Sequence, residues 1–434
     1  MKVNIITLGC SKNTADSEHV AGTLRKAGMQ VSFDSPKTEA DIIVVNTCGF
    51  IGDAKEESVN TLLEQVSVKM RGRKKRYLIA VGCLIERYKE ELRNEIPEID
   101  AFYGVHEWEQ LCQDIITLQQ GQCLRVENFE HSRLHSTPRH YAYLKIAEGC
   151  NRRCSYCAIP LIRGAHVSRP IEDILEEARQ MVDSGVKELI VIAQDTTYYG
   201  LDLYGERRLG TLLRRLAEES GAEWIRLHYT YPTSFPQDAI EVMRQYPNIC
   251  NYIDIPLQHI NSRILTSMQR GIDRQGTIDL LNRFREMMPD VAIRTTFIAG
   301  YPTETEEEFE ELKAFVKEAR FDRMGVFPYS PEEGTAAEQI GDDVPQEEKE
   351  RRVSELMAIQ EQISLEKNEA KVGRTYKVII DRREDDYYIG RTEYDSPEVD
   401  DEVLIPAIKT LEIGQFYQVT VTSALENDLY GVLA

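Results

Sequence analysis

Three closely spaced cysteines, Cys150, Cys154 and Cys157, form a CxxxCxxC pattern within residues 145–158 (KIAEGCNRRCSYCA). Thiolates are the usual ligands of iron–sulfur clusters, and a cube of four irons can take one cysteine per iron. Because no fourth cysteine follows nearby, one iron would keep an open position for a substrate or cofactor. The alternative is a structural zinc knuckle, which a fourth ligand would normally close.

A second set of cysteines is dispersed: Cys10, Cys48 and Cys83 each follow a strand-like run and end the sequences TLGC, NTC and VGC. In an open parallel sheet the carboxyl ends of the strands share one edge, where ligands usually bind. Glycines at 9, 49 and 82 allow close approach of the backbone. The three thiols could hold a second cluster, although buried cysteines without a ligand are equally compatible with this pattern.

The chain has nine cysteines, and disulfides are rare in cytosolic proteins, so closely spaced cysteines favour metal binding or catalysis. The remaining three have no comparable placement and are expected to be ordinary small apolar residues: Cys112, Cys123 and Cys250.

Alternating strand-like and helical stretches predict an α/β fold. Residues 1–120 contain strand-like runs at 3–8, 41–46 and 77–81, each followed by a helical stretch, which predicts a doubly wound parallel sheet. Residues 121–139 lack periodicity and are interpreted as a linker.

Residues 140–345 contain six strand–helix units, which favour a partial (β/α)6 barrel of TIM type, open on one side. The expected strands are 143–147, 188–193, 224–229, 252–257, 292–298 and 324–329. A connecting helix at 346–372 leads to residues 373–434, where five short alternating strands predict a small antiparallel β-barrel.

At 434 residues the chain fits two or three domains. Its net charge of −21 argues against strong non-specific attraction to nucleic acid and makes a positively charged protein partner more natural. No apolar run approaches the roughly 20 residues that span a bilayer. Residues 1–9 are too short for a signal peptide, so we expect a cytoplasmic protein without a membrane partner.

The CxxxCxxC loop, with Tyr156 before its last cysteine, resembles the signature of the radical S-adenosylmethionine (SAM) superfamily. The resemblance implies a 4Fe–4S cluster that chelates SAM and, with one electron from a donor, cleaves it to a radical. The segments LGCSKN, NTCGFI and GCLIERY resemble the amino-terminal domain of the methylthiotransferases, and residues 373–434 resemble a TRAM domain. This second resemblance implies that Cys10, Cys48 and Cys83 hold an auxiliary 4Fe–4S cluster.

Methylthiotransferases modify either adenosine (position 37) of transfer RNA or the β-carbon of an aspartate in small-subunit ribosomal protein S-twelve. The segments that resemble the ribosomal-protein branch are LGCSKN, CGFIGDAKEES, CLIERY, AQDTTYYG and DSPEVDDEV. The transfer-RNA branch more often has Gln-Met-Asn after its first cysteine, where this chain has Ser11, Lys12 and Asn13. The resemblance therefore implies methylthio transfer to the ribosomal protein, with the transfer-RNA activity as the alternative.

Charge favours the same branch. Residues 373–434 carry 13 acidic and 6 basic side chains, whereas a domain that grips RNA should carry many lysines and arginines. Ribosomal proteins are basic, so an acidic surface would attract one. We interpret the acidic run in this domain as such a surface, or else as an ordinary solvated face: Asp395, Glu398, Asp400, Asp401 and Glu402. A non-catalytic cysteine–metal scaffold that binds a basic partner is the competing functional class.

The family mechanism implies two uses of SAM: one molecule methylates a sulfur on the auxiliary cluster, and a second supplies the radical that abstracts hydrogen from the substrate. Tyr156, Asp195 and Arg294 are predicted to line the SAM pocket, with Asp195 accepting from a ribose hydroxyl and Arg294 pairing with a carboxylate. Further residues follow barrel strands, where active sites gather, although ordinary barrel structure is the alternative: Gln194, Gln258 and His259, the last expected to be structural.

Overall fold

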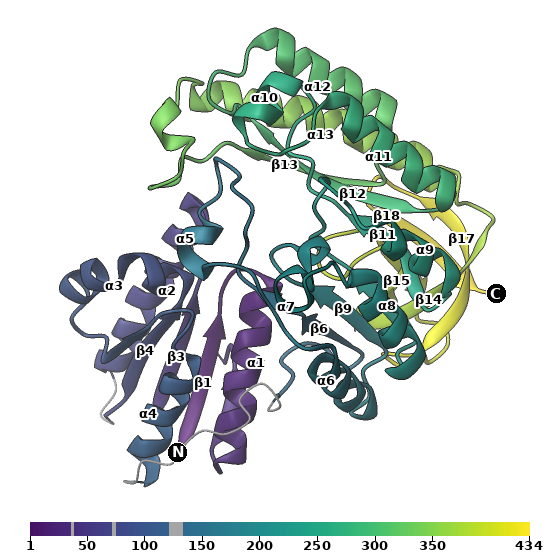
Figure 1. The fold of residues 1–434 in the computed structure, drawn as a ribbon. Helices are drawn as coiled ribbons and strands as arrows, with labels where there is room; N and C mark the ends of the chain where they lie inside the picture. Colours follow the sequence, from purple (N-terminus) through teal and green to yellow (C-terminus); the bar gives the residue numbers. More distant parts are fainter. Residues whose placement is uncertain (36–38, 72–74, 121–132) are drawn as a thin grey trace.

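The computed structural model describes residues 1–35, 39–71, 75–120 and 133–434. Cys123 and residues 121–132 of the expected linker lie outside the described residues. The described residues form two parallel sheets, a small two-stranded antiparallel sheet and a closed barrel, and the parallel sheets and the barrel follow one another from the purple end to the yellow end of Figure 1. No helix of the described residues is long and apolar enough to cross a membrane.

The first sheet has five parallel strands in the order β2-β1-β3-β4-β5. The sequence predicts only three of these strands, because β2 and β5 are too short to give a strand-like run. Helix α4 was not predicted either, since it follows the short β5. The strands are β1 (Lys2–Thr7), β2 (Gln30–Phe33), β3 (Ile42–Thr47), β4 (Tyr77–Gly82) and β5 (Ala101–Tyr103). The helices are α1 (Ser11–Lys26), α2 (Gly52–Arg71), α3 (Cys83–Glu95) and α4 (Trp108–Gln120).

The second sheet has six parallel strands in the order β13-β12-β11-β10-β9-β6, which confirms the predicted partial barrel. Its strands are β6 (Tyr141–Lys145), β9 (Glu188–Ile192), β10 (Trp224–Leu227), β11 (Ile249–Asp254), β12 (Ala292–Ala299) and β13 (Arg323–Pro328). The helices between them are α6 (Ile171–Asp183), α8 (Leu209–Glu219), α9 (Gln237–Gln245), α11 (Arg274–Met287) and α12 (Glu306–Ala319).

Shorter elements decorate the loops of this second sheet. They are β7 (Ala147–Glu148), α5 (Ile159–Arg163), β8 (Val167–Ser168), η2 (Thr196–Tyr198), α7 (Leu201–Tyr204), α10 (Ser262–Ser267) and η3 (Glu338–Ile340).

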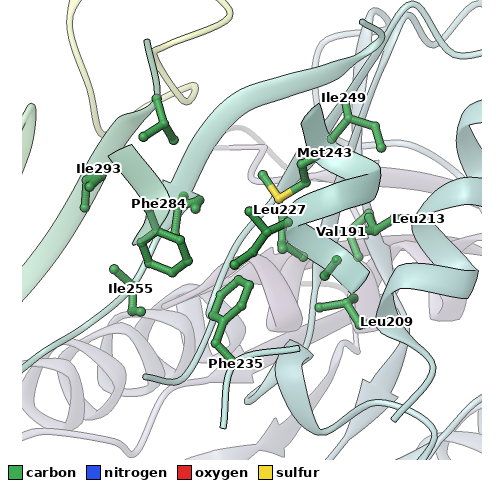
Figure 2. Packing of buried hydrophobic residues seen from close by; sticks show 14 of the residues in the cluster. Val191, Leu209, Leu213, Leu227, Phe235, Met243, Ile249, Ile255, Phe284 and Ile293 are labelled. Carbon is green, nitrogen blue, oxygen red and sulfur yellow. The ribbon is translucent and has the colours of Figure 1, made fainter. Parts of the chain in front are cut away.

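The main core lies between the second sheet and its outer helices. Figure 2 shows strand residues such as Val191 and Leu227 packed against Leu209 and Met243 of the helices and Phe235 of a connecting loop. Every residue of β9 is buried, as expected for a parallel strand that is covered on both faces. This packing fixes the strand ends, from which the loops with functional side chains emerge.

The carboxy-terminal segment forms a closed five-stranded barrel in the order β14-β15-β16-β18-β17, as predicted. Helix α13 (Gln346–Glu369) leads into it, and its strands are β14 (Thr375–Glu384), β15 (Tyr387–Thr392), β16 (Glu402–Pro406), β17 (Phe416–Ala424) and β18 (Asp428–Leu433). Ile379 of the barrel packs with Trp224, Cys250 and Ala292. These three residues lie near the amino ends of β10, β11 and β12, so the barrel closes the end of the sheet opposite the cysteine loop.

The side chains of the three aspartates in the acidic run are buried and paired within the chain, so for them both sequence interpretations, a surface that attracts a basic partner and a solvated face, are wrong. Asp395 and Asp401 are buried, and both pair with Arg323 of β13, Asp401 at 2.8 Å. The side chain of Asp400 accepts from Arg294 (3.2 Å) and from the hydroxyl of Tyr252. These carboxylates fasten the barrel to the second sheet instead of facing solvent or a partner.

The two glutamates of the run, Glu402 and Glu398, also have partners within the chain. Glu402 pairs with Arg382 within the barrel at 2.6 Å. Glu398 is exposed as a residue, yet its carboxylate accepts from the hydroxyl of Tyr141 at 2.9 Å. The run therefore gives no independent support for a basic partner.

Candidate active site

The CxxxCxxC loop lies between β7 and α5, and its backbone is held from both sides. The Cys150 N–H donates to the carbonyl of Gly164 (3.1 Å), and the Ser155 N–H donates to the carbonyl of Met268 (3.1 Å). The Ser155 hydroxyl also lies 2.8 Å from the hydroxyl of Tyr301. The loop is therefore fixed before any cluster binds.

Cys154 has a cationic and a phenolic neighbour. Its sulfur lies 3.4 Å from the guanidinium of Arg270 and 3.3 Å from the hydroxyl of Tyr231. Burial raises its pKa, but the Arg270 charge and the hydrogen bonds outweigh burial and hold that pKa below the ordinary value. Burial raises the pKa of Cys150 to about 11 and that of Cys157 to about 12. One thiolate of the trio is thus favoured before the others.

The dispersed cysteines meet at the carboxyl edge of the first sheet. Cys10 caps α1, Cys48 follows β3, and Cys83 is the first residue of α3. A Cβ added at Gly9 would lie 2.9 Å from the Cys48 sulfur, and Gly9 has a φ of 89°. The glycine is therefore required both by the backbone turn and by the close approach of Cys48.

The charges around this trio resemble those around the first. Burial raises the pKa of Cys48 to about 11, and the neighbouring Cys10 and Cys83 sulfurs add to the rise. Burial also acts on Cys10, but the charges of Lys12 and Arg163 outweigh it and lower the pKa of that thiol. In each trio a nearby cation therefore favours one thiolate.

Within the described ranges no three His, Cys, Asp or Glu side chains stand close enough together to hold a single metal ion. A four-iron cube makes a different demand, because each cysteine binds its own iron and the sulfurs stand farther apart than around one ion. The donor chemistry of both trios, all thiol with one cation-favoured thiolate, fits such a cluster.

Arg163 connects the two trios. This residue of α5 is 2% exposed and donates to the Cys83 sulfur (3.4 Å) and to the side-chain oxygen of Asn13 (2.6 Å). Its other nitrogen contacts Asp16 (3.1 Å) and Glu148 (2.9 Å). Since α5 begins two residues after Cys157, one guanidinium ties the CxxxCxxC loop to the edge of the first sheet.

A second contact joins the first helix to the end of β10. The hydroxyls of Ser11 and Tyr229 lie 3.3 Å apart, and the Lys12 ammonium lies 3.1 Å from the centre of the Tyr229 ring. Tyr229 has a φ of 55°, a left-handed conformation that is strained for a tyrosine. Its N–H donates to Asp254 (2.9 Å), which holds the residue in place.

A third contact fastens the first sheet to the loop after β13. The buried carboxylate of Glu332 pairs with Arg87 (2.7 Å) of α3 and Lys55 (3.0 Å) of α2. Arg87 also donates to the carbonyl of Gly49 at 3.1 Å, next to Cys48. We call these three charged residues, Lys55, Arg87 and Glu332, the Glu332 clasp.

The residues predicted for the SAM pocket already have partners within the chain. The Tyr156 hydroxyl lies 3.2 Å from Arg270. Asp195 accepts from the Thr197 N–H and hydroxyl with one oxygen and from Arg152 (2.7 Å) with the other. Arg152 in turn stacks over Tyr231, which places Asp195 beside the cysteine loop.

Arg294 has different surroundings from Tyr156 and Asp195. It pairs with Asp254 (3.3 Å) and Asp400 (3.2 Å), and Asp400 belongs to the acidic run of the carboxy-terminal barrel. It also lines a cavity of about 230 Å³ together with Arg323 and Asp401. The predicted carboxylate pairing therefore occurs within the chain, away from the residues that surround the cysteine loop.

Of the other residues predicted at strand ends, one joins the Arg163 network and the others do not. Gln194 donates to Glu148 (2.6 Å) and joins the Arg163 network. His259 is fully buried and accepts from the Asn261 N–H (3.0 Å), as a structural histidine would. Gln258 has a φ of 75°, and its side-chain oxygen is buried without a hydrogen-bond partner in the described residues. Cys112 and Cys250 are buried in apolar clusters, as expected.

Sequence reasoning missed the cations that surround the sulfurs. Arg163 and Arg270 contact cysteines 80 and 116 residues away in the chain, and no spacing pattern indicates such pairs. The sequence could have indicated that Lys12 lies near a cysteine, since it follows Cys10 by two residues in the segment LGCSKN. Its contact with Tyr229 depends on how the first sheet sits on the second.

Three protein families match successive parts of the chain. Residues 144–316 match the radical SAM superfamily, residues 2–104 match uncharacterized protein family UPF0004, and residues 372–433 match the TRAM domain. Among solved structures, the chain resembles the radical SAM methyltransferase TsrM from Kitasatospora setae at a TM-score of 0.57 and 13% identity, over 76% of each chain. It resembles the cobalamin-dependent radical enzyme OxsB at a TM-score of 0.53, also at 13% identity, over 83% of this chain and 56% of that one. These two likenesses show the fold alone.

Curated relatives match from end to end. The ribosomal protein uS12 methylthiotransferase RimO of Bacteroides thetaiotaomicron is 54% identical over 99% of this chain and 97% of its own. Proteins of the same name from Christiangramia forsetii and Porphyromonas gingivalis are each 51% identical over 99% of this chain, and 94% and 98% of their own lengths are covered. The chain therefore belongs to the radical SAM methylthiotransferase family, in the branch of the ribosomal protein uS12 methylthiotransferases.

Proposed function

We propose that this chain adds a methylthio group to the β-carbon of an aspartate in ribosomal protein uS12, the small-subunit protein S-twelve. The reaction needs SAM, an external electron donor and a cluster at each cysteine trio. The observation that carries the proposal is the Arg163 contact, because it links the sulfur-rich edge of the first sheet to the CxxxCxxC loop. The choice of substrate rests on the end-to-end similarity to the uS12 enzymes.

The cysteines divide between two tasks in this proposal. When bound, a cluster at Cys150, Cys154 and Cys157 would supply one-electron cleavage of SAM, and a cluster at Cys10, Cys48 and Cys83 would carry the sulfur to be transferred. Arg270 and Arg163 donate to one sulfur in each trio, which stabilises negative charge there.

Other contacts hold the two cysteine trios in a fixed position relative to each other. Arg163 and the Glu332 clasp fix the first sheet over the second from two sides. Asp195 orients Arg152, whose guanidinium lies 4.0 Å from the centre of the Tyr231 ring beside Cys154. We include Tyr156, Asp195 and Arg294 as proposed SAM-pocket residues, of which Tyr156 and Asp195 have supporting positions near the loop.

The test is anaerobic incubation of the reconstituted protein with SAM, a reductant and either uS12 or transfer RNA, followed by mass spectrometry. We expect a methylthio mass increase on one aspartate of uS12 and none on transfer RNA. Replacement of Cys10 by alanine should abolish the transfer, whereas Cys112→Ala, which removes a cysteine outside both trios, should retain it. Methylthio groups on transfer RNA with uS12 unmodified would contradict the substrate assignment.

A further inference from the structure

Lys12 is a buried cation without a carboxylate partner among the described residues. Lys12 is 7% exposed, and its ammonium forms no ion pair with a carboxylate in the described ranges. Burying an ammonium without an anion is costly, and buried lysines are normally paired. Lys145 shows the usual arrangement nearby, since its ammonium pairs with both Asp16 and Glu148.

Lys12 lies where the start of α1 meets the residues that follow β10. The residue lies in the first turn of α1, two positions after Cys10. Its ammonium faces the Tyr229 ring, which follows the carboxyl end of β10 in the second sheet. Tyr229 has a left-handed φ of 55°, a conformation that is strained for a tyrosine.

The other two cations of this junction, Arg163 and Lys145, are already paired with carboxylates. Arg163 contacts Asp16, Glu148 and Asn13, so its charge is balanced within the chain. Lys12 is the cation of these three that has no carboxylate partner in the described residues; its neighbours are the Tyr229 ring and Cys10.

We propose that the Lys12 ammonium binds the side-chain carboxylate of the substrate aspartate. This inference rests on the proposed function, in which the reacting β-carbon is bonded directly to that carboxylate. Pairing the carboxylate with Lys12 places the β-carbon near Cys10 and near the Tyr229 ring after the end of β10. A neutral amide in place of the carboxylate, or a nucleobase, offers no charge to the buried ammonium.

A competing role for Lys12 is to balance negative charge on Cys10. The two roles predict different outcomes when the positive charge is removed. A substrate-binding lysine affects only substrates that carry the carboxylate. A lysine that serves Cys10 affects the iron site and all substrates alike.

The experiment compares uS12 with a form in which its target aspartate is replaced by asparagine. Kd for both is measured anaerobically by titration of the reconstituted wild-type, Lys12→Met and Lys12→Arg proteins. We expect the wild type to bind the aspartate form about 10- to 100-fold more tightly, as for a hydrogen bond to a charged group. Lys12→Met should bind the two forms equally, and Lys12→Arg should regain part of the preference.

Iron content and the electron paramagnetic resonance spectrum report on the competing role, and both should be unchanged in Lys12→Met. The matched control is Lys89→Met, which removes a lysine of α3 that pairs with Glu107, and it should keep the wild-type preference. Equal loss of affinity for both uS12 forms, or a changed spectrum, would overturn the role of Lys12. Failure of the wild type to modify uS12 would instead overturn the proposed function.

Discussion

Arg163 stands six residues after Cys157 in the sequence, yet its guanidinium donates to the sulfur of Cys83, the first residue of α3 at the edge of the first sheet. The short spacing of Cys150, Cys154 and Cys157 could be read from the sequence, and so could the position of the dispersed cysteines at the ends of strands. The contacts of Arg163 and Arg270 with the sulfurs could not, because these arginines lie 80 and 116 residues from the cysteines that they contact. At the residue scale, ligands were predictable and their electrostatic partners were not.

Replacing Arg163 by methionine removes this charge, and among the described residues Lys145 is then the cationic partner left to Asp16 and Glu148. Because one partner of a buried network is lost, we expect the free energy of unfolding to fall by about 3 kcal/mol. Denaturant unfolding measures the change. Arg215→Met is the control: Arg215 is 31% exposed and pairs with Glu172 and Glu219, so its loss should cost less than about 1 kcal/mol. Equal losses in the two variants would contradict the account of Arg163.

At the scale of elements, the long strands and helices were predictable and the short ones were not. The strand-like runs gave β3, β4 and the whole second sheet, whereas the three-residue β5 carries too little pattern to be recognised. Helix α1 begins at Ser11, directly after Cys10, whose carbonyl accepts from the Thr14 N–H. That start is functionally relevant, since it places Lys12 in the first turn.

The contact between the second sheet and the carboxy-terminal barrel includes a buried triad: Glu188 pairs with Arg226 (2.7 Å) and Arg391 (2.6 Å). Despite the opposing effect of burial, these cations lower the pKa of Glu188 from 4.5 to about 2. A carboxyl with a lowered folded-state pKa stabilises the fold above about pH 4.5 and loses that effect as pH falls toward 2. The shift corresponds to roughly 3 kcal/mol.

Glu188→Gln tests this element. We expect the variant to be less stable than the wild type at neutral pH and the difference to shrink by roughly 3 kcal/mol as pH falls below 4.5. Unfolding by denaturant at a series of pH values provides the comparison. A difference that stays constant down to pH 2 would mean that Glu188 does not titrate as its ion pairs require.

At the scale of the whole molecule, the distribution of charged residues in the sequence was the least reliable guide to the partner of the protein. The acidic run from Asp395 to Glu402 suggested a partner surface, but its aspartates are internal fastenings to Arg323 and Arg294. Sequence charge alone does not distinguish exposed carboxylates from buried, paired ones. The substrate assignment therefore depends on similarity to relatives and not on electrostatics.

The Glu332 clasp offers a test of how the two sheets cooperate. Glu332→Gln should weaken the hold of Arg87 and Lys55 on the loop after β13 while it leaves all six cysteines intact. We expect methylthio transfer to uS12 to fall at least about tenfold, since small misplacements at a reaction site are costly. Reductive cleavage of SAM, measured as released 5′-deoxyadenosine, should persist. Parallel loss of both activities would show that the clasp does more than align the sheets.

The central claim is that two separate cysteine trios each hold a cluster, and iron content after anaerobic reconstitution tests it most directly. We expect about eight irons per wild-type chain and about four in each of two variants, one with alanine at 10, 48 and 83 and one with alanine at 150, 154 and 157. Cys112→Ala should match the wild type. Wild-type iron content in the first triple variant would contradict the claim.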